Sequence, residues 1–271
     1  MSETARLDLD AYFQRIGYGG PCETSFGVLS ALHALQPAAI PFENLDPLLG
    51  RPVSLDLASL QAKLVNGRRG GYCFELNGLF RAVLDAIGFV VTPLIARVCW
   101  MAPPERPEGP RSHMLMRVEL ADGPYLADVG FGGHLLGAPL RFEVGAEQQT
   151  PGGRQRLIAS GPVHTLQTLL PSGWQDVYRF TLEPAVAADY EVSNWYTSTH
   201  PASIFRNALL MERLTPLARY SMFNDRLIER REGEVRERII GPSELHGVLE
   251  NIFDLELPEP DEAIWARLPQ S

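Results

Sequence analysis

The chain has 271 residues, enough for more than one subdomain around a large buried core. Its formal net charge of −9 and its lack of a basic tract argue against a nucleic-acid partner. No apolar run reaches membrane-spanning length without charged residues, and the start, MSETARLDLD, lacks the basic and apolar blocks of a secretory signal. We therefore expect a cytoplasmic protein with no nucleic-acid or membrane partner.

The first third of the chain has the apolar periodicity of helices. Asp8 is a candidate N-cap for a first helix that Gly17 can end. SFGVLSALHAL predicts a second helix, which should stop before Pro37 because proline lacks the N–H that a helix interior needs. SLDLASLQAKLVNG predicts a third helix, which ends at Gly67.

The strongest helical pattern starts at Cys73 and ends at Gly88, with its apolar side chains on one face. Unpaired backbone N–H groups and the helix dipole stabilise an anion in the first turn, so this position favours the reactive thiolate. The two glycines of RRGGYC permit close backbone approach, and its two arginines add positive potential that Glu75 partly opposes. An activated nucleophile requires such an environment.

The other two cysteines, Cys22 and Cys99, lie in a Gly/Pro turn and at the end of an apolar run, and we interpret both as structural. An odd number of cysteines without CxxC spacing predicts neither a disulfide framework nor a cysteine-based zinc site.

From about residue 89 the pattern changes to short β-rich segments bounded by glycine and proline. FVVTPLIARVCW, HMLMRVEL and PYLADVGF predict strands, and HTLQTLLPSGWQDVYRFTLEP predicts a hairpin around Pro171–Gly173. MAPPERPEGPR predicts a proline-rich surface loop directly before His113.

The remainder of the chain mixes helical and strand patterns. SNWYTSTHPASIFRNALLMER predicts a connector with helical character, RREGE the turn of a hairpin, and SELHGVLENIFDL a helix with Ser243 as its N-cap. Helices, then antiparallel strands, then a mixed lobe indicate an α+β fold and not a doubly wound parallel sheet.

A thiolate nucleophile needs a base, and His113 is the best-placed histidine. It begins one predicted strand, and Asp128 lies near the end of the next. A hairpin with an even number of loop residues puts both side chains on one face. The tightest loop, centred on Asp122–Gly123, would set Asp128 opposite Arg117, four positions from His113. A longer turn or a bulge is then needed for contact.

The remaining histidines are less suited to act as the base. They lie in helical stretches at the surface or core edge (His33 and His246), near turns (His164 and His200) or in a loop (His134). If Cys73, His113 and Asp128 meet, the cysteine is the nucleophile, the histidine takes and returns its proton, and the aspartate fixes the imidazole tautomer. The alternative is three unrelated residues, and spacing alone leaves both interpretations open.

Several motifs resemble those of the arylamine N-acetyltransferase family. RRGGYCFELNG is similar to the family's RGGxCxELN signature around its nucleophile. SHMLMRVEL and LADVGFG resemble its histidine and aspartate segments, in the same chain order. IPFENLD resembles its N-terminal signature and NWYTSTHPASIFR its interdomain segment; the resemblance fades after about residue 210.

The resemblance implies a fold with a cysteine-protease-like core of the papain and transglutaminase kind. A helical bundle that carries the nucleophile is expected over residues 1–88, and a β-barrel that carries the histidine and aspartate over 89–193. A connector over 194–210 and an α/β lid over 211–271 complete the expected division.

The resemblance also implies ping-pong chemistry without a metal. Acetyl-CoA would acetylate Cys73, CoA would leave, and an arylamine, arylhydrazine or N-hydroxyarylamine would take the acetyl group. His113 would act as the base and Asp128 would orient it.

Further residues match the family's motifs at positions that contact substrates. Phe42, Phe131 and Phe205 match aromatic residues of the acceptor pocket, where apolar walls suit an aryl ring and keep water from a thioester. Gly130 and Gly132 leave the groove open for the CoA pantetheine arm, or serve only the turn after the strand, and Ser112 is a candidate hydrogen-bond donor to CoA. Glu43 and Arg69 match a charged pair that we expect to brace the loop before Cys73.

Three other functions fit parts of the pattern. An amide synthase of the same family would use the same residues to form a macrolactam from a carrier-bound acyl chain. A papain- or transglutaminase-like hydrolase would use the same constellation, although PFENL and ELNG argue against it. A binding protein with a merely structural cysteine is the third.

Overall fold

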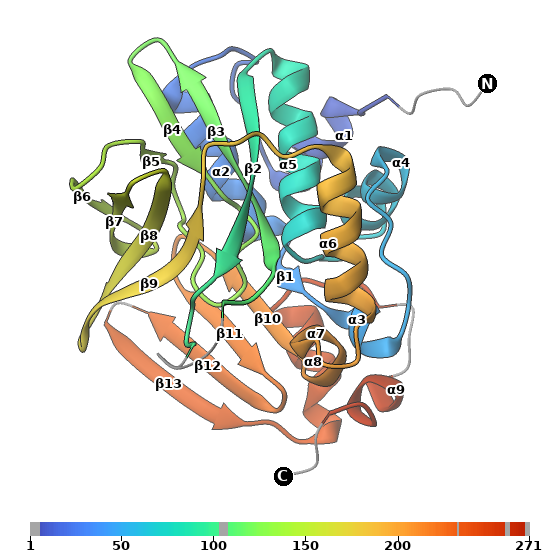
Figure 1. The fold of residues 1–271 in the computed structure, drawn as a ribbon. Helices are drawn as coiled ribbons and strands as arrows, with labels where there is room; N and C mark the ends of the chain where they lie inside the picture. Colours follow the sequence, from blue (N-terminus) through green and yellow to red (C-terminus); the bar gives the residue numbers. More distant parts are fainter. Residues whose placement is uncertain (1–5, 103–107, 232, 258–260, 269–271) are drawn as a thin grey trace.

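The computed structural model describes residues 6–102, 108–231, 233–257 and 261–268. Helices pack beside a strongly curved sheet, and a second sheet lies below them in the view of Figure 1. The elements that precede the curved sheet are α1 (Leu9–Ile16), α2 (Phe26–Ala39), β1 (Phe42–Glu43), α3 (Leu45–Leu49), α4 (Leu57–Leu60), the π-helix η1 (Gln61–Asn66) and α5 (Cys73–Ile87).

Local signals predicted most of these helices correctly. Asp8 caps α1 by accepting a hydrogen bond from the Ala11 N–H at 2.9 Å, and Gly17 ends it in the left-handed conformation. The helix α5 starts at Cys73 and stops at Gly88, as predicted. The predicted third helix also ends at Gly67 as expected. Its second half is the π-helix η1, which the apolar pattern does not indicate.

The predicted end of α2 before Pro37 is wrong, because the helix continues to Ala39. Pro37 removes only one hydrogen bond near the end of the helix, and the turn around it is buried. Gln36 accepts a hydrogen bond from the Tyr12 hydroxyl at 2.7 Å and donates one to the Leu76 carbonyl at 3.0 Å. These buried contacts hold the last turn in place.

The larger sheet has eight strands in the order β5-β4-β3-β2-β9-β8-β7-β6, with antiparallel neighbours. Its strands are β2 (Val90–Val98), β3 (Arg111–Leu120), β4 (Gly123–Ala127), β5 (Leu140–Arg141), β6 (Glu147–Thr150), β7 (Gly153–Ser160), β8 (Val163–Leu170) and β9 (Gly173–Phe180). The edges approach one another, because the Gln148 side chain on β6 hydrogen-bonds the Arg141 N–H and carbonyl on β5 at 2.8 and 2.9 Å. The sheet is therefore a nearly closed barrel.

The barrel separates two apolar cores. On β3, Met114 and Met116 face the helices, whereas Leu115 faces the barrel interior. The predicted hairpin around Pro171–Gly173 is confirmed, because Leu170 pairs with Gly173. The loop predicted over residues 101–111 lies partly outside the described residues.

The second sheet joins distant parts of the chain in the order β1-β10-β11-β12-β13. Its later strands are β10 (Leu210–Leu214), β11 (Arg219–Phe223), β12 (Arg226–Arg231) and β13 (Glu234–Ile239). The remaining helices are α6 (Ala187–Thr199), α7 (Ile204–Asn207), the 3₁₀-helix η2 (Pro242–Glu244), α8 (Leu245–Asn251) and α9 (Asp261–Trp265). The sequence did not reveal that β1 would pair with β10.

The arrangement confirms the predicted α+β class with helices, barrel and C-terminal α/β lobe (Figure 1). The prediction of Ser243 as an N-cap is wrong, because Ser243 lies inside η2 and the Glu244 carboxylate accepts the Gly241 N–H at 2.9 Å instead. Within the described part of the chain, no helix is long and apolar enough to cross a membrane. The exact division into four parts stays a prediction.

Candidate active site

Cys73 is the first residue of α5 and is 4% exposed. Its thiol donates a hydrogen bond to the Ser112 carbonyl at 3.6 Å. The residue lines a cavity of about 1510 Å³ between the helices, the barrel and the C-terminal sheet. The structure thus places the predicted nucleophile at a helix start that opens into a large cavity.

His113 and Asp128 meet in the structure. The His113 Nε2 lies 2.7 Å from the Asp128 Oδ2, and both side chains are buried. The turn is centred one residue earlier than expected, because Leu120 pairs with Gly123, and the pairing of the two strands is therefore shifted by two residues. Continuing the ladder puts Asp128 opposite Leu115, a diagonal neighbour of His113 on the same face. A longer turn is not needed.

The charge of Asp128 governs the protonation of His113. Burial disfavours the imidazolium, but the Asp128 charge and hydrogen bonds with Asp128 and Cys73 outweigh it and raise the pKa of His113 to about 10. At neutral pH the ring is therefore protonated. Because Nε2 is held by Asp128, Nδ1 is the nitrogen left for Cys73.

Asn77 holds Asp128 from α5, a role that the sequence analysis missed. Its Nδ2 donates to the Asp128 Oδ1 at 2.9 Å, and its Oδ1 accepts the Val129 N–H at 3.0 Å. Burial opposes ionisation of Asp128, but His113, Asn77 and the Gly130 N–H lower its pKa overall. The spacing of four residues from Cys73 puts Asn77 on the face of α5 that carries the nucleophile, and this signal could have revealed it.

His33 supports Asp128 from the other side. The expectation of a surface or core-edge residue is wrong, because His33 is fully buried and its Nε2 accepts the Asp128 N–H at 3.1 Å. Burial lowers the pKa of His33 to about 4, so the ring is neutral. Its position four residues after Leu29 places it on the buried face of α2, which the helical pattern could have indicated.

The three predicted pocket aromatics all line the cavity. The Phe131 ring stands edge-on to His113, with centroids 5.0 Å apart, and the Phe42 and Phe205 rings lie 6.1 Å apart. The Tyr178 ring, which the sequence analysis did not select, covers another side of His113 at 5.0 Å. The cavity therefore has aromatic walls beside the predicted base.

Gly130, Gly132 and Ser112 also line the cavity. A Cβ on Gly130 would stand 2.9 Å from the Cys73 Cα, and one on Gly132 would stand 2.2 Å from the Phe42 ring. Both glycines are thus required by packing within the protein, whatever the cavity binds.

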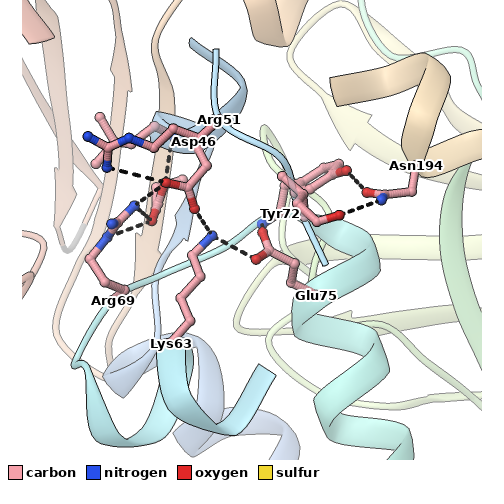
Figure 2. Close-up of polar contacts among 10 residues, drawn as sticks. Asp46, Arg51, Lys63, Arg69, Tyr72, Glu75 and Asn194 are labelled. Atoms are coloured by element: carbon pink, nitrogen blue, oxygen red, sulfur yellow. Dashed lines mark hydrogen bonds and ion pairs between the residues drawn. The ribbon is translucent and has the colours of Figure 1, made fainter. Parts of the chain in front are cut away.

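Five charged residues, which we name the ionic cluster, lie close together near the start of α5: the buried Glu43, Asp46, Arg69 and Glu75 and the partly buried Lys63. Lys63 lies between Asp46 and Glu75 (Figure 2), and its Nζ is 2.6 Å from the Asp46 Oδ2 and 2.7 Å from the Glu75 Oε1. The Arg69 Nη2 lies 2.8 Å from the Glu43 Oε1. Although burial disfavours its charge, the carboxylates of Glu75, Glu43 and Asp46 raise the pKa of Lys63.

The ionic cluster holds the backbone that leads to Cys73. The Glu75 Oε2 accepts the Tyr72 N–H at 3.1 Å, and the Tyr72 hydroxyl donates to Asn194 on α6 (Figure 2). A Cβ on Gly71 would stand 2.8 Å from the Glu75 Oε2, which explains the glycine. The contact between Glu43 and Arg69 agrees with the bracing expected of this pair.

The arginines of RRGGYC do not supply the free positive charge that we expected beside Cys73. Arg68 lies 2.9 Å from both Asp254 and Glu256, and Arg69 is paired within the ionic cluster. Each guanidinium is thus matched by carboxylates. Among the described residues, no group of three or more His, Cys, Asp or Glu side chains is arranged to hold a metal ion.

Comparisons with known proteins agree on one family. A family model described as N-acetyltransferase matches residues 25–262. The arylamine N-acetyltransferase of Mycolicibacterium smegmatis is 42% identical over 255 residues, which cover 93% of each chain. A solved structure of the M. smegmatis enzyme superposes with a TM-score of 0.92 at 40% identity and covers 97% of this chain and 98% of that one. The Mycobacterium marinum arylamine N-acetyltransferase, solved in complex with CoA, has a TM-score of 0.92 at 36% identity and covers 96% of this chain and 98% of that one.

Proposed function

The chain belongs to the arylamine N-acetyltransferase family, a family of acyltransferases, and we propose that it moves an acetyl group from acetyl-CoA to an arylamine or arylhydrazine through a thioester on Cys73. The observation that carries the proposal is the hydrogen-bonded His113–Asp128 pair on the same cavity as a cysteine at a helix start.

In the first half-reaction the Cys73 thiolate attacks the thioester carbonyl of acetyl-CoA. The imidazolium of His113 balances the thiolate beforehand, and its raised pKa favours this ion pair. Backbone N–H groups at the start of α5 stabilise the oxyanion that forms. The carbon–sulfur bond to CoA breaks, and the CoA sulfur takes the proton of the His113 imidazolium as it leaves. The acetyl group stays on Cys73, and the His113 ring is now neutral.

In the second half-reaction the amine nitrogen attacks the acetyl carbon of the Cys73 thioester. His113 takes the proton that the nitrogen loses, and Asp128 keeps the ring oriented and stabilises its charge. The carbon–sulfur bond breaks, and Cys73 returns as the thiolate. The rings of Phe42, Phe131 and Phe205 form the walls against which an aryl group packs.

Intact mass spectrometry tests the thioester directly. Treatment with acetyl-CoA should add one acetyl group to the wild type and none to Cys73→Ser. An equal gain in both proteins would show that acetylation occurs elsewhere and would overturn the proposed role of Cys73.

The macrolactam-forming alternative is not favoured, because the curated relatives at 40–45% identity are named arylamine N-acetyltransferases. Release of CoA from acetyl-CoA that depends on an aromatic amine supports N-acetylation. If no aromatic amine increases the release of CoA from acetyl-CoA, the amide synthase becomes the better interpretation. A cytoplasmic location, which three free cysteines support, is part of the proposal.

A further inference from the structure

One face of the C-terminal sheet forms a wall of the cavity. The strand pairing puts alternate residues of β10, β11 and β12 on the cavity face. Met211 and Met222 lie on the other face and belong to the apolar core that includes residues of α8, although they also reach the edge of the cavity. The residues on the cavity face include Glu212, Leu214, Arg219, Ser221, Ile228 and Arg230.

Two arginines stand directly opposite one another on this face. Arg219 on β11 pairs with Arg230 on β12, and like charges in this position destabilise a sheet unless something balances them. Arg219 is fully engaged: it donates to the Leu135 carbonyl at 2.8 Å and to the His134 Nδ1 at 3.0 Å, and its Nε lies 3.7 Å from the Glu212 Oε1.

No comparable partner balances Arg230. In the described part of β10 to β13, every other arginine has an ion pair with a carboxylate: Arg213, Arg219, Arg226, Arg231, Arg236 and Arg238. Arg230 is exposed to the cavity, and the structure gives it neither an ion pair nor a hydrogen bond within the described residues.

The charge of Arg230 acts on the carboxylates of Glu212 and Glu237, but both already interact with other groups. Glu212 accepts the N–H groups of Gly133 and Leu135 and faces Arg219, while Glu237 lies 2.6 Å from Arg226. Burial, Arg219 and Arg230 together lower the pKa of His134 to about 3, so this ring adds no charge. The wall therefore presents an uncompensated guanidinium to the cavity.

We propose that Arg230 is an anion-binding residue that takes a phosphate group of CoA on the wall formed by the C-terminal sheet. A planar guanidinium matches phosphate oxygens with paired hydrogen bonds, and a phosphate between the strands offsets the repulsion between Arg219 and Arg230. The proposal rests on the proposed function for the identity of the ligand. The cavity, about 1510 Å³, exceeds the roughly 300–1,000 Å³ typical of small-ligand pockets and accommodates a nucleotide thioester.

The test compares acetyl donors with and without phosphates in Arg230→Gln. The KM for acetyl-CoA should rise about tenfold, as expected for loss of a charge-assisted hydrogen bond. The KM for S-acetyl-pantetheine, which has no phosphate, should change much less, so the preference for acetyl-CoA falls. The control is Arg236→Gln, an exposed arginine of the same sheet that is paired with Glu234 and lies outside the cavity lining.

The proposal would be overturned if the ratio of the KM values for acetyl-CoA and S-acetyl-pantetheine were the same in Arg230→Gln as in the wild type. It would also be overturned if Arg236→Gln raised the KM for acetyl-CoA as much as Arg230→Gln does. Calorimetric titration of CoA and 3′-dephospho-CoA into the Cys73→Ser background needs no turnover. The two proposals can fail separately. If CoA binding depends on Arg230 but acetyl-CoA does not acetylate Cys73 in the wild type, the proposed function is refuted and the anion site is supported. Binding that Arg230→Gln does not weaken would refute the anion site.

Discussion

Two walls of the cavity hold the proposed catalytic side chains by different means. Cys73 begins the same helix as Glu75 of the ionic cluster, in which lysine and arginine side chains pair with carboxylates (Figure 2). On the barrel wall, Asp128 pairs with His113, and neutral groups hold this pair in place: Asn77 from α5, His33 from α2 and the Gly130 N–H. Aromatic rings enclose His113.

The difference follows from the backbone on each wall. His113 lies within β3 and Asp128 directly after β4, where the ladder between the strands already fixes the main chain. Cys73 follows Gly70 and Gly71, which tolerate close packing but do not restrict the chain. Only a short bridge, with hydrogen bonds from Glu43 N–H to the Gly71 carbonyl and from Gly71 N–H to the Pro41 carbonyl, ties this segment to its neighbour, and ion pairs reinforce it on the helical wall. Variants on the barrel wall should affect chemistry most, and variants in the ionic cluster should affect stability most.

The largest expected effect is on the barrel wall. Asp128→Asn keeps the shape but removes the charge, so the pKa of His113 falls from about 10 and the ion pair with Cys73 is lost at neutral pH. We expect the rate of Cys73 acetylation to fall by about 10³–10⁴-fold, as when the aspartate of a catalytic triad is replaced by its amide. Rapid-quench mass spectrometry measures it.

Alkylation of Cys73 by iodoacetamide at pH 7 should slow in the same variant, because less thiolate is present. The melting temperature should change little, since the strand ladder remains. Full acetylation activity in Asp128→Asn would remove Asp128 from the mechanism. A collapsed melting transition would instead show that the barrel wall depends on charge as the helical wall does.

The next effect concerns the ionic cluster. Lys63→Met leaves the carboxylates of Asp46 and Glu75 buried without their shared partner. Breaking a buried ion pair in this way costs about 3–5 kcal/mol. Urea denaturation should show this loss in the free energy of unfolding. Acetylation at a temperature where the variant stays folded should fall far less than in Asp128→Asn.

Lys63→Arg is the matched control, because it retains the charge. It should recover most of the stability that Lys63→Met loses. If both variants are as stable as the wild type, the ionic cluster does not hold the helical wall. If Lys63→Met is stable but as inactive as Asp128→Asn, the contrast between the two walls is wrong.

The contrast between the walls also explains what the sequence could predict. Cys73, His113 and Asp128 sit in local motifs, and helix ends such as Gly17 follow from single residues with known conformational preferences. The pairing of β1 with β10 brings together segments far apart in the chain, and no local pattern encodes it. The register of β3 and β4 depended on where the turn was centred, and a shift of one residue changed the pairing.

The ionic cluster was harder to foresee for a similar reason. Lys63 is the only lysine in the chain, but a charged residue in a helical pattern usually lies in solvent. Only the folded arrangement brings it between Asp46 and Glu75. Arg68 and Arg69 were assigned to the thiol because they are its neighbours in sequence, whereas their carboxylate partners lie elsewhere in the chain.

The smallest expected effect is the contribution of the neutral His33 ring to the pH dependence of stability. Burial holds the pKa of His33 near 4, below its ordinary value of 6.5. The unfolded chain therefore binds a proton at His33 before the folded protein does, so its contribution to stability is present above pH 6.5 and is lost as the pH falls toward 4. The slope is about 1.4 kcal/mol per pH unit for one group.

His33→Gln should remove one such contribution, because glutamine does not titrate but still offers an oxygen to the Asp128 N–H. Urea denaturation at several values between pH 4 and 6.5 should therefore give a shallower loss of stability in the variant than in the wild type. Identical slopes in the wild type and His33→Gln would mean that His33 already carries a proton in the folded protein. The barrel wall would then hold Asp128 by charge, in the same way that the ionic cluster holds the start of α5.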